Sequence, residues 1–163
     1  MNPSGSRPTR SSPPRRTSCS PSTRRTRAPI VLVAEEGVVA TIHAGWRGLL
    51  AGIVTAGVRA VRTAGGRTIT AVLGPCIHRE CYEFGPADLQ RLEGRLGATV
   101  RASTAAGRPA LDLPAAVRAA LVAEGIDRLE DVDRCTGCDP SFHSHRVRGD
   151  TGRQATLAWI SGP

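Results

Sequence analysis

Blocks of apolar residues, separated by glycine and polar residues, predict a mixture of short strands and helices along the chain. Two β-branched runs, 30–34 and 38–43, flank Gly37 and predict a hairpin with a glycine-containing turn. Small and apolar residues then recur at helical spacing over 47–64, and a pair of glycines follows as a C-terminal stop. The first half of the domain therefore predicts a hairpin followed by one long helix.

The second half predicts shorter elements around a polar segment. Pro86 suits the first turn of one helix, and Gly125 suits the end of another. The predicted strands lie at 69–73, 99–102, 110–113 and 154–160, the predicted helices at 86–96 and 114–124, and an irregular polar segment at 134–150. Because strands and helices mix without strict strand–helix–strand alternation, the sequence predicts an α/β (α+β) fold, a compact sandwich with a mixed sheet.

The composition is that of one globular domain. The chain has 163 residues, 40% of them hydrophobic, which is enough to form a single core. No apolar run approaches the roughly 20 residues that a membrane helix needs. No apolar segment follows the basic N-terminus, as it would in a secretory signal. We therefore expect a cytoplasmic protein with no membrane partner. The five cysteines are odd in number, which argues against a disulfide framework.

The net charge of +8 is concentrated at the N-terminus. Seven arginines and no acidic residue occur in the first 27 positions, which leaves 15 arginines against 14 acidic residues in the remainder. Residues 1–27 are predicted to form a disordered Arg/Ser/Pro-rich tail, and nucleic acid is not the expected partner of the nearly neutral body. Three interpretations of the tail stay open: a basic arm for RNA or DNA, a transit-like peptide, or a segment read out of frame. The composition favours the last.

His43 is the first candidate for chemistry, because it ends an apolar strand and precedes Ala-Gly-Trp-Arg-Gly. Side chains at strand ends converge on clefts, and glycine lets backbone approach a ligand closely. Arg47 would lie near the first turn of the next helix, where free N–H groups and a guanidinium both attract an oxyanion. The alternative is a strand-to-helix turn with a buried histidine and a surface arginine.

The cysteines offer two further constellations. Cys135 and Cys138 precede His143 and His145, and these soft or borderline ligands suggest zinc, although the two pairs lie too close together for a zinc finger. The alternative is a loop whose thiols and imidazoles pack or hydrogen-bond. Cys76 or Cys81 would be a nucleophile if an imidazole lowered its pKa, and a small buried thiol is the competing interpretation.

These pieces occur together in the order of one family. The matching segments are HAGWRG at 43–48, LGPCI at 73–77, YEFG at 82–85, DRCT at 133–136, FHSHR at 142–146 and TGR at 151–153. The chain from about residue 28 to residue 160 resembles the laccase-domain family, also called multicopper polyphenol oxidase-like or the purine nucleoside phosphorylase family. By this resemblance, residues 28–163 form the C-terminal two-thirds of a laccase-like domain.

The resemblance implies an activity and a set of site residues. Family members phosphorolyse adenosine, inosine, guanosine or methylthioadenosine and deaminate adenosine, so a purine nucleoside and phosphate are the implied partners, with a homodimer as a further candidate. His43 is the implied metal ligand and catalytic residue, and Arg47 the implied anion contact. His145, Arg146 and Arg153 are the implied substrate-binding residues. The implied cofactor is zinc, or copper in the older assignment.

The metal site that the resemblance implies is incomplete in this sequence. The family holds its ion with a His–Cys–His triad, of which only His43 is present. The family cysteine position falls on Arg27, Cys19 lies eight residues too early, and no histidine precedes His43. We therefore expect weak zinc binding and little phosphorylase activity. A non-catalytic remnant or interaction protein, and a nucleic-acid binder that uses the basic tail, are the alternatives.

Overall fold

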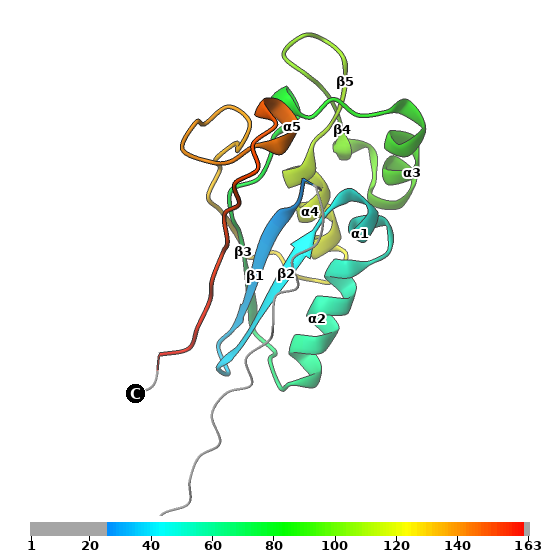
Figure 1. Ribbon diagram of the computed structural model, residues 1–163. Coiled ribbons are helices and arrows are strands. Elements are labelled where there is room, and N and C mark those ends of the chain that lie inside the picture. The colour runs from blue at the N-terminus through cyan, green and yellow to red at the C-terminus, as the bar shows by residue number, and fades with distance from the viewer. Residues whose placement is uncertain (1–25, 162–163) are drawn as a thin grey trace, which may run out of the picture.

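A four-stranded mixed sheet is the centre of the computed structural model, which describes residues 26–161 (Figure 1). The strands are β1 (Ala28–Ala34), β2 (Val38–Ala44), β3 (Ile69–Leu73) and β6 (Leu129–Asp131), in the order β2-β1-β3-β6. β1 is antiparallel to both β2 and β3, whereas β6 is parallel to β3. The predicted α/β class with a mixed sheet is therefore confirmed. The predicted disorder of residues 1–27 stays a prediction, because residues 1–25 lie outside the described part of the chain.

The described helices are α1 (Trp46–Leu50), α2 (Ile53–Thr63), α3 (Pro86–Leu96), α4 (Leu113–Val122) and α5 (His145–Arg148), with 3-10 turns η1 (Arg79–Cys81) and η2 (Ala98–Val100). Of these, α2 and α4 pack against the strands of the sheet. Alternate residues of β1, among them Ile30 and Leu32, are fully buried under α2 and α4. Gly57 of α2 allows the closest approach, because a Cβ there would come within 2.3 Å of Ile42 on β2.

The predicted hairpin and the short elements are confirmed to within a few residues. Gly37 forms the turn between β1 and β2 with a φ of 80°, a conformation that glycine adopts without a steric penalty. The two short predicted strands pair as a ribbon of β4 (Arg101–Ser103) and β5 (Pro109–Leu111). Asp112 caps α4, since its carboxylate accepts the backbone N–H of Ala115 at 2.9 Å. Of the described residues, no helix is long and apolar enough to cross a membrane.

The single long helix predicted over 47–64 is wrong. The chain forms α1 and α2 instead, and they are separated by Ala51 and Gly52. Gly52 has a φ of 79°, in the left-handed region that ends a helix. The apolar periodicity continues across the break because both helices contribute to the same core, so the pattern did not reveal it. The break separates the residues next to His43 from the long helix.

The strand predicted over 154–160 is also wrong. The segment is extended in backbone but pairs with no strand of the described residues, and Leu157 and Trp159 are 77% and 76% exposed. A β-branched and aromatic run favours extended backbone, yet it becomes a strand only beside a free strand edge. Here the segment runs alongside the strands without pairing (Figure 1), and Thr156 lies beside Gly74. The short strand β6 was missed because its Leu-Glu-Asp sequence has no strand pattern.

Candidate functional site

His43 lies on the face of the sheet that the helices leave free. Its neighbours Ile42 and Ala44 point into the core, while His43 is exposed opposite Pro29 in the register of β1 and β2. Loss of hydration around the ring lowers the pKa of His43, and the positive charge of Arg27 lowers it further. The imidazole is therefore mostly neutral near pH 7 and has a free lone pair to accept a proton or a hydrogen bond.

Arg47 and Arg146 lie at opposite ends of one aromatic cluster. The Arg47 guanidinium stacks 4.4 Å from the Trp46 ring, and Arg146 lies 5.2 Å from the Tyr82 ring. Phe84 joins the two rings with edge-to-face contacts of 5.4 Å on each side. Arg146 also donates to the carbonyl of Glu83 at 2.6 Å. Arg146 is thus held by protein groups, whereas Arg47 also lines a surface hollow.

That hollow has a volume of about 350 Å³, and its lining residues are Trp46, Arg47, Leu50, Ala51 and Arg91. The guanidinium of Arg91 also pairs with Asp88 at 3.3 Å. A second hollow of about 430 Å³ lies over α4. His43 lines neither of these two hollows.

His145 and Arg153 are both exposed, on different segments. His145 begins α5, and Arg153 lies on the extended C-terminal segment. This segment is attached to the preceding loop through Gln154, whose side chain accepts from the N–H of His143 at 3.0 Å and donates to its carbonyl at 3.3 Å. Within the described residues, neither His145 nor Arg153 has a hydrogen bond or ion pair with His43.

The surroundings of His43 do not fit a catalytic zinc ion. Such an ion needs three protein ligands and an open position. Of the described residues, His43 belongs to no group of three His, Cys, Asp or Glu side chains whose ligand atoms lie within 4.8 Å of one another. The neighbouring charge is the guanidinium of Arg27, which repels a cation. We therefore derive no reaction step through a metal at His43.

A different part of the molecule does bring metal-ligand side chains together. β3 and β6 are parallel neighbours, so the chain leaves both strands at the same edge of the sheet. The loop after β3 carries Cys76, His78 and Cys81, and the loop after β6 carries Cys135 and Cys138. A backbone bridge between Cys76 and Cys135 continues the parallel pairing beyond the strands.

The thiols of Cys81, Cys135 and Cys138 lie within 4.8 Å of one another, and His78, Glu80 and Cys135 form a second such group. The sulfurs of Cys81 and Cys138 are 3.2 Å apart. Among the described residues, His143 and His145 belong to neither group, so the zinc grouping weighed for them with Cys135 and Cys138 is not found. Tertiary structure instead places Cys81 near both cysteines and His78 near Cys135.

The individual thiols differ in acidity. Burial raises the pKa of Cys135, but hydrogen bonds from the backbone N–H groups of His78, Cys138 and Gly137 outweigh it, so the pKa falls below its ordinary value. Hydrogen bonding with Cys81 and Cys135 raises the pKa of Cys138 to about 12. Burial likewise raises the pKa of Cys76 to about 12, which supports the interpretation of Cys76 as a packed thiol rather than a nucleophile.

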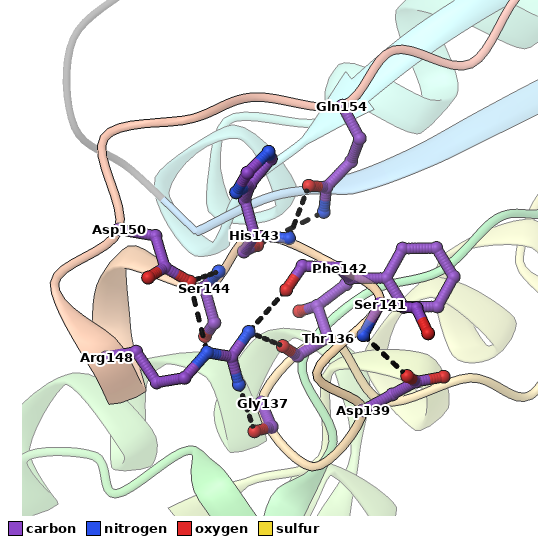
Figure 2. A network of polar contacts seen from close by, with 10 residues as sticks. All are labelled: Thr136, Gly137, Asp139, Ser141, Phe142, His143, Ser144, Arg148, Asp150 and Gln154. Carbon is purple, nitrogen blue, oxygen red and sulfur yellow. Dashed lines mark hydrogen bonds and ion pairs between the residues drawn. The ribbon is translucent and has the colours of Figure 1, made fainter.

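Arg148, which the sequence analysis did not single out, organises the loop that carries Cys135 and Cys138 (Figure 2). Its guanidinium donates to the carbonyls of Gly137 at 2.8 Å, Thr136 at 3.3 Å and Phe142. It also pairs with Asp150 at 3.1 Å, and Asp150 in turn accepts the N–H of Ser144 at 2.8 Å. The sequence signal was present as an arginine and an aspartate two residues apart, but their carbonyl partners are visible only in the fold.

Most of the chain is similar to known proteins. Residues 28–161 match the family described as Multi-copper polyphenol oxidoreductase laccase. A purine nucleoside phosphorylase of Mycobacterium tuberculosis is 36% identical over 129 residues, which are 78% of this chain and 51% of the relative. An adenosine deaminase from an unknown prokaryotic organism is 37% identical over 138 residues, which are 78% of this chain and 53% of the relative. The chain spans about half the length of the curated relatives it matches.

Solved structures agree with the fold. YlmD from Geobacillus stearothermophilus superposes with a TM-score of 0.68 at 34% sequence identity, over 79% of this chain and 52% of that protein. A Bacillus licheniformis protein, YfiH, superposes with a TM-score of 0.67 at 28% identity, over 77% of this chain and 51% of that protein. The mixed sheet and its helices are therefore shared with these proteins.

Proposed function

The chain belongs to the multi-copper polyphenol oxidoreductase laccase family, as the ordered motifs predicted, and on this premise we propose that it acts on purine nucleosides, with impaired turnover. The proposal is supported by the match over 28–161 and by relatives named purine nucleoside phosphorylase and adenosine deaminase. The reactions proposed are phosphorolysis of adenosine, inosine, guanosine or methylthioadenosine and deamination of adenosine.

The observation that carries the proposal is the exposed His43 near the end of β2, inside the family hexapeptide. A neutral imidazole accepts a hydrogen bond or a proton from a substrate without a prior protonation change. Arg47, which lines the same hollow as Arg91, is the proposed contact for the phosphate co-substrate, because a guanidinium forms charge-assisted hydrogen bonds with an oxyanion. His145, Arg146 and Arg153 stay weaker proposals for substrate contacts, since Arg146 already has protein partners.

The proposed impairment of turnover follows from the lack of further metal ligands around His43 among the described residues. With Arg27 as the neighbouring charge and no group of three ligands among the described residues, His43 lacks the coordination that a catalytic metal requires. The same observation favours the second candidate function, a non-catalytic member of the family that keeps the fold. A nucleic-acid role of the tail stays a prediction, because residues 1–25 lie outside the described part.

The test is turnover of each nucleoside by the purified full chain, with and without phosphate, measured by chromatographic detection of free base and of inosine. We expect slow turnover that falls further in His43→Ala and Arg47→Ala but not in Arg59→Ala, an exposed control on α2. We also expect zinc content by elemental analysis to be the same in His43→Ala and the parent chain.

Two results would contradict the proposal. Turnover that equals the buffer control for every nucleoside would overturn the enzymatic function and support the non-catalytic alternative. Fast turnover with zinc lost specifically in His43→Ala would show that His43 does hold a metal, which would refute the impairment.

A further inference from the structure

The thiol cluster at the carboxyl edge of β3 and β6 has no part in the function proposed above. We propose that Cys81, Cys135 and Cys138 bind a divalent cation of the zinc class, with His78 as the fourth ligand. The site clamps the two loops that leave the parallel strands. It does not depend on His43, so it stands or falls separately from the nucleoside activity.

The ligands come from two separate elements, as in closed structural zinc sites. Cys81 ends η1 in the loop after β3, and Cys135 and Cys138 lie in the loop after β6. The spacing Cys-x2-Cys in one loop is typical of zinc ligands, but the sequence separation of 57 residues to Cys81 hides the third. Cys81 and Cys135 are half-buried and Cys138 is exposed, so an ion has access from solvent.

The distances suit coordination after a small adjustment. Three sulfurs around tetrahedral zinc, each about 2.3 Å from the ion, lie about 3.8 Å from one another. The three thiol sulfurs already fall within 4.8 Å of one another, and the pair Cys81–Cys138 at 3.2 Å must open by only about 0.6 Å. A nitrogen of His78 lies within 4.8 Å of the Cys135 sulfur, so Cys135 joins both groups of ligands and His78 is the proposed fourth ligand.

The backbone is prepared for a thiolate at Cys135. The N–H of His78 donates to its sulfur, and this bond measures 3.3 Å. Such N–H donors stabilise a thiolate in the deprotonated form that a metal requires. Gly137 has a second role, because a Cβ at this position would lie 2.9 Å from the sulfur of Cys81. Glycine is therefore what allows the two loops to approach.

A disulfide between Cys81 and Cys138 explains less of this arrangement. Their sulfurs would have to close from 3.2 Å to about 2.05 Å, and the product would leave Cys135 and the His78 N–H that donates to it without a role. A metal uses all three thiols and the backbone donor together. The disulfide is therefore treated as the competing outcome of the experiment.

The experiment is a titration of the reduced full chain with Co²⁺ and then Zn²⁺ under anaerobic conditions. We expect one equivalent of Co²⁺ to give the intense visible bands and thiolate-to-cobalt charge transfer of a tetrahedral thiolate site, and Zn²⁺ to displace it. Cys81→Ser and Cys138→Ser should each weaken zinc affinity by more than the roughly 10–100-fold typical of losing an outer-shell partner. His78→Ala should shift the cobalt bands while retaining the charge transfer.

Cys76→Ala and His43→Ala are the matched controls, because Cys76 is a described thiol that belongs to neither group of ligands and His43 is the family histidine. Both should bind zinc as the parent does, and zinc should raise the melting temperature of both. The proposal is overturned if the reduced parent chain shows no thiolate-to-cobalt charge transfer, or if binding disappears in His43→Ala. It is equally overturned if mass spectrometry finds a Cys81–Cys138 disulfide and the reduced protein retains no zinc. The parent spectra decide the matter even where a cysteine variant fails to fold.

Discussion

Arg148→Met tests whether the guanidinium network organises the loop over residues 136–150. Methionine keeps most of the length and apolar volume of the side chain but removes every donor. The change leaves the carbonyls of Thr136, Gly137 and Phe142 without this partner and removes the ion pair with Asp150. The loop would then have to be held by its remaining backbone contacts.

The magnitude follows from the number of bonds and their exposure. A buried hydrogen bond to a charged group contributes about 1.5–3 kcal/mol. The Arg148 side chain is 31% exposed, so water replaces part of each lost bond and about 1 kcal/mol apiece is the better figure. Three carbonyl bonds and one exposed carboxylate pair therefore predict a loss of about 2–4 kcal/mol in the free energy that holds this loop.

Urea denaturation and amide hydrogen exchange measure this loss together. Exchange is needed because the loop is able to open without global unfolding. We expect lower protection across 136–150, and a lower unfolding free energy if the loop unfolds with the core. Arg128→Met is the matched control, since its pair with Glu35 is about two-thirds exposed on both sides and should contribute about 0–1 kcal/mol. The reasoning is refuted if Arg148→Met and Arg128→Met behave alike in both measurements.

Three further predictions concern stability. Leu32→Ala should lower the free energy of unfolding by about 2–5 kcal/mol in chemical denaturation, because Leu32 is fully buried. Val33→Ala, on the free face of the same strand, should lower it clearly less. Equal losses would contradict the assigned faces. Asp112→Ala should cost about 1 kcal/mol through loss of the α4 cap, and Asp112→Asn should restore most of it. The N–H of Ser144 holds the pKa of Asp150 below its ordinary value of 3.8, so its stabilisation is complete above 3.8 and is lost as pH falls through the lower folded-state pKa. Asp150→Asn should flatten that acid-side loss in urea midpoints measured against pH, and an unchanged profile would contradict the assignment.

Local sequence patterns were sufficient to predict an element where the segment and its structural partner are close in sequence. The hairpin of β1 and β2 was predictable because Gly37 and the flanking β-branched residues specify it within one short stretch. The helix α3 was predictable to its ends from Pro86 and the apolar spacing. Periodicity failed at Gly52, because apolar residues on both sides of the break serve one core, and it failed over 154–160, because strand formation requires a free edge elsewhere in the fold.

By itself, the sequence determined the class of fold and the identity of the family motifs. It did so because these are properties of residue type and short spacing. Only the tertiary structure decided that Cys135 and Cys138 lie near Cys81, and Cys135 near His78, instead of near His143 and His145. The physical reason is the parallel pairing of β3 and β6, which delivers two loops far apart in the chain to one edge of the sheet. The spacing of residues within either loop does not predict that the two loops come together.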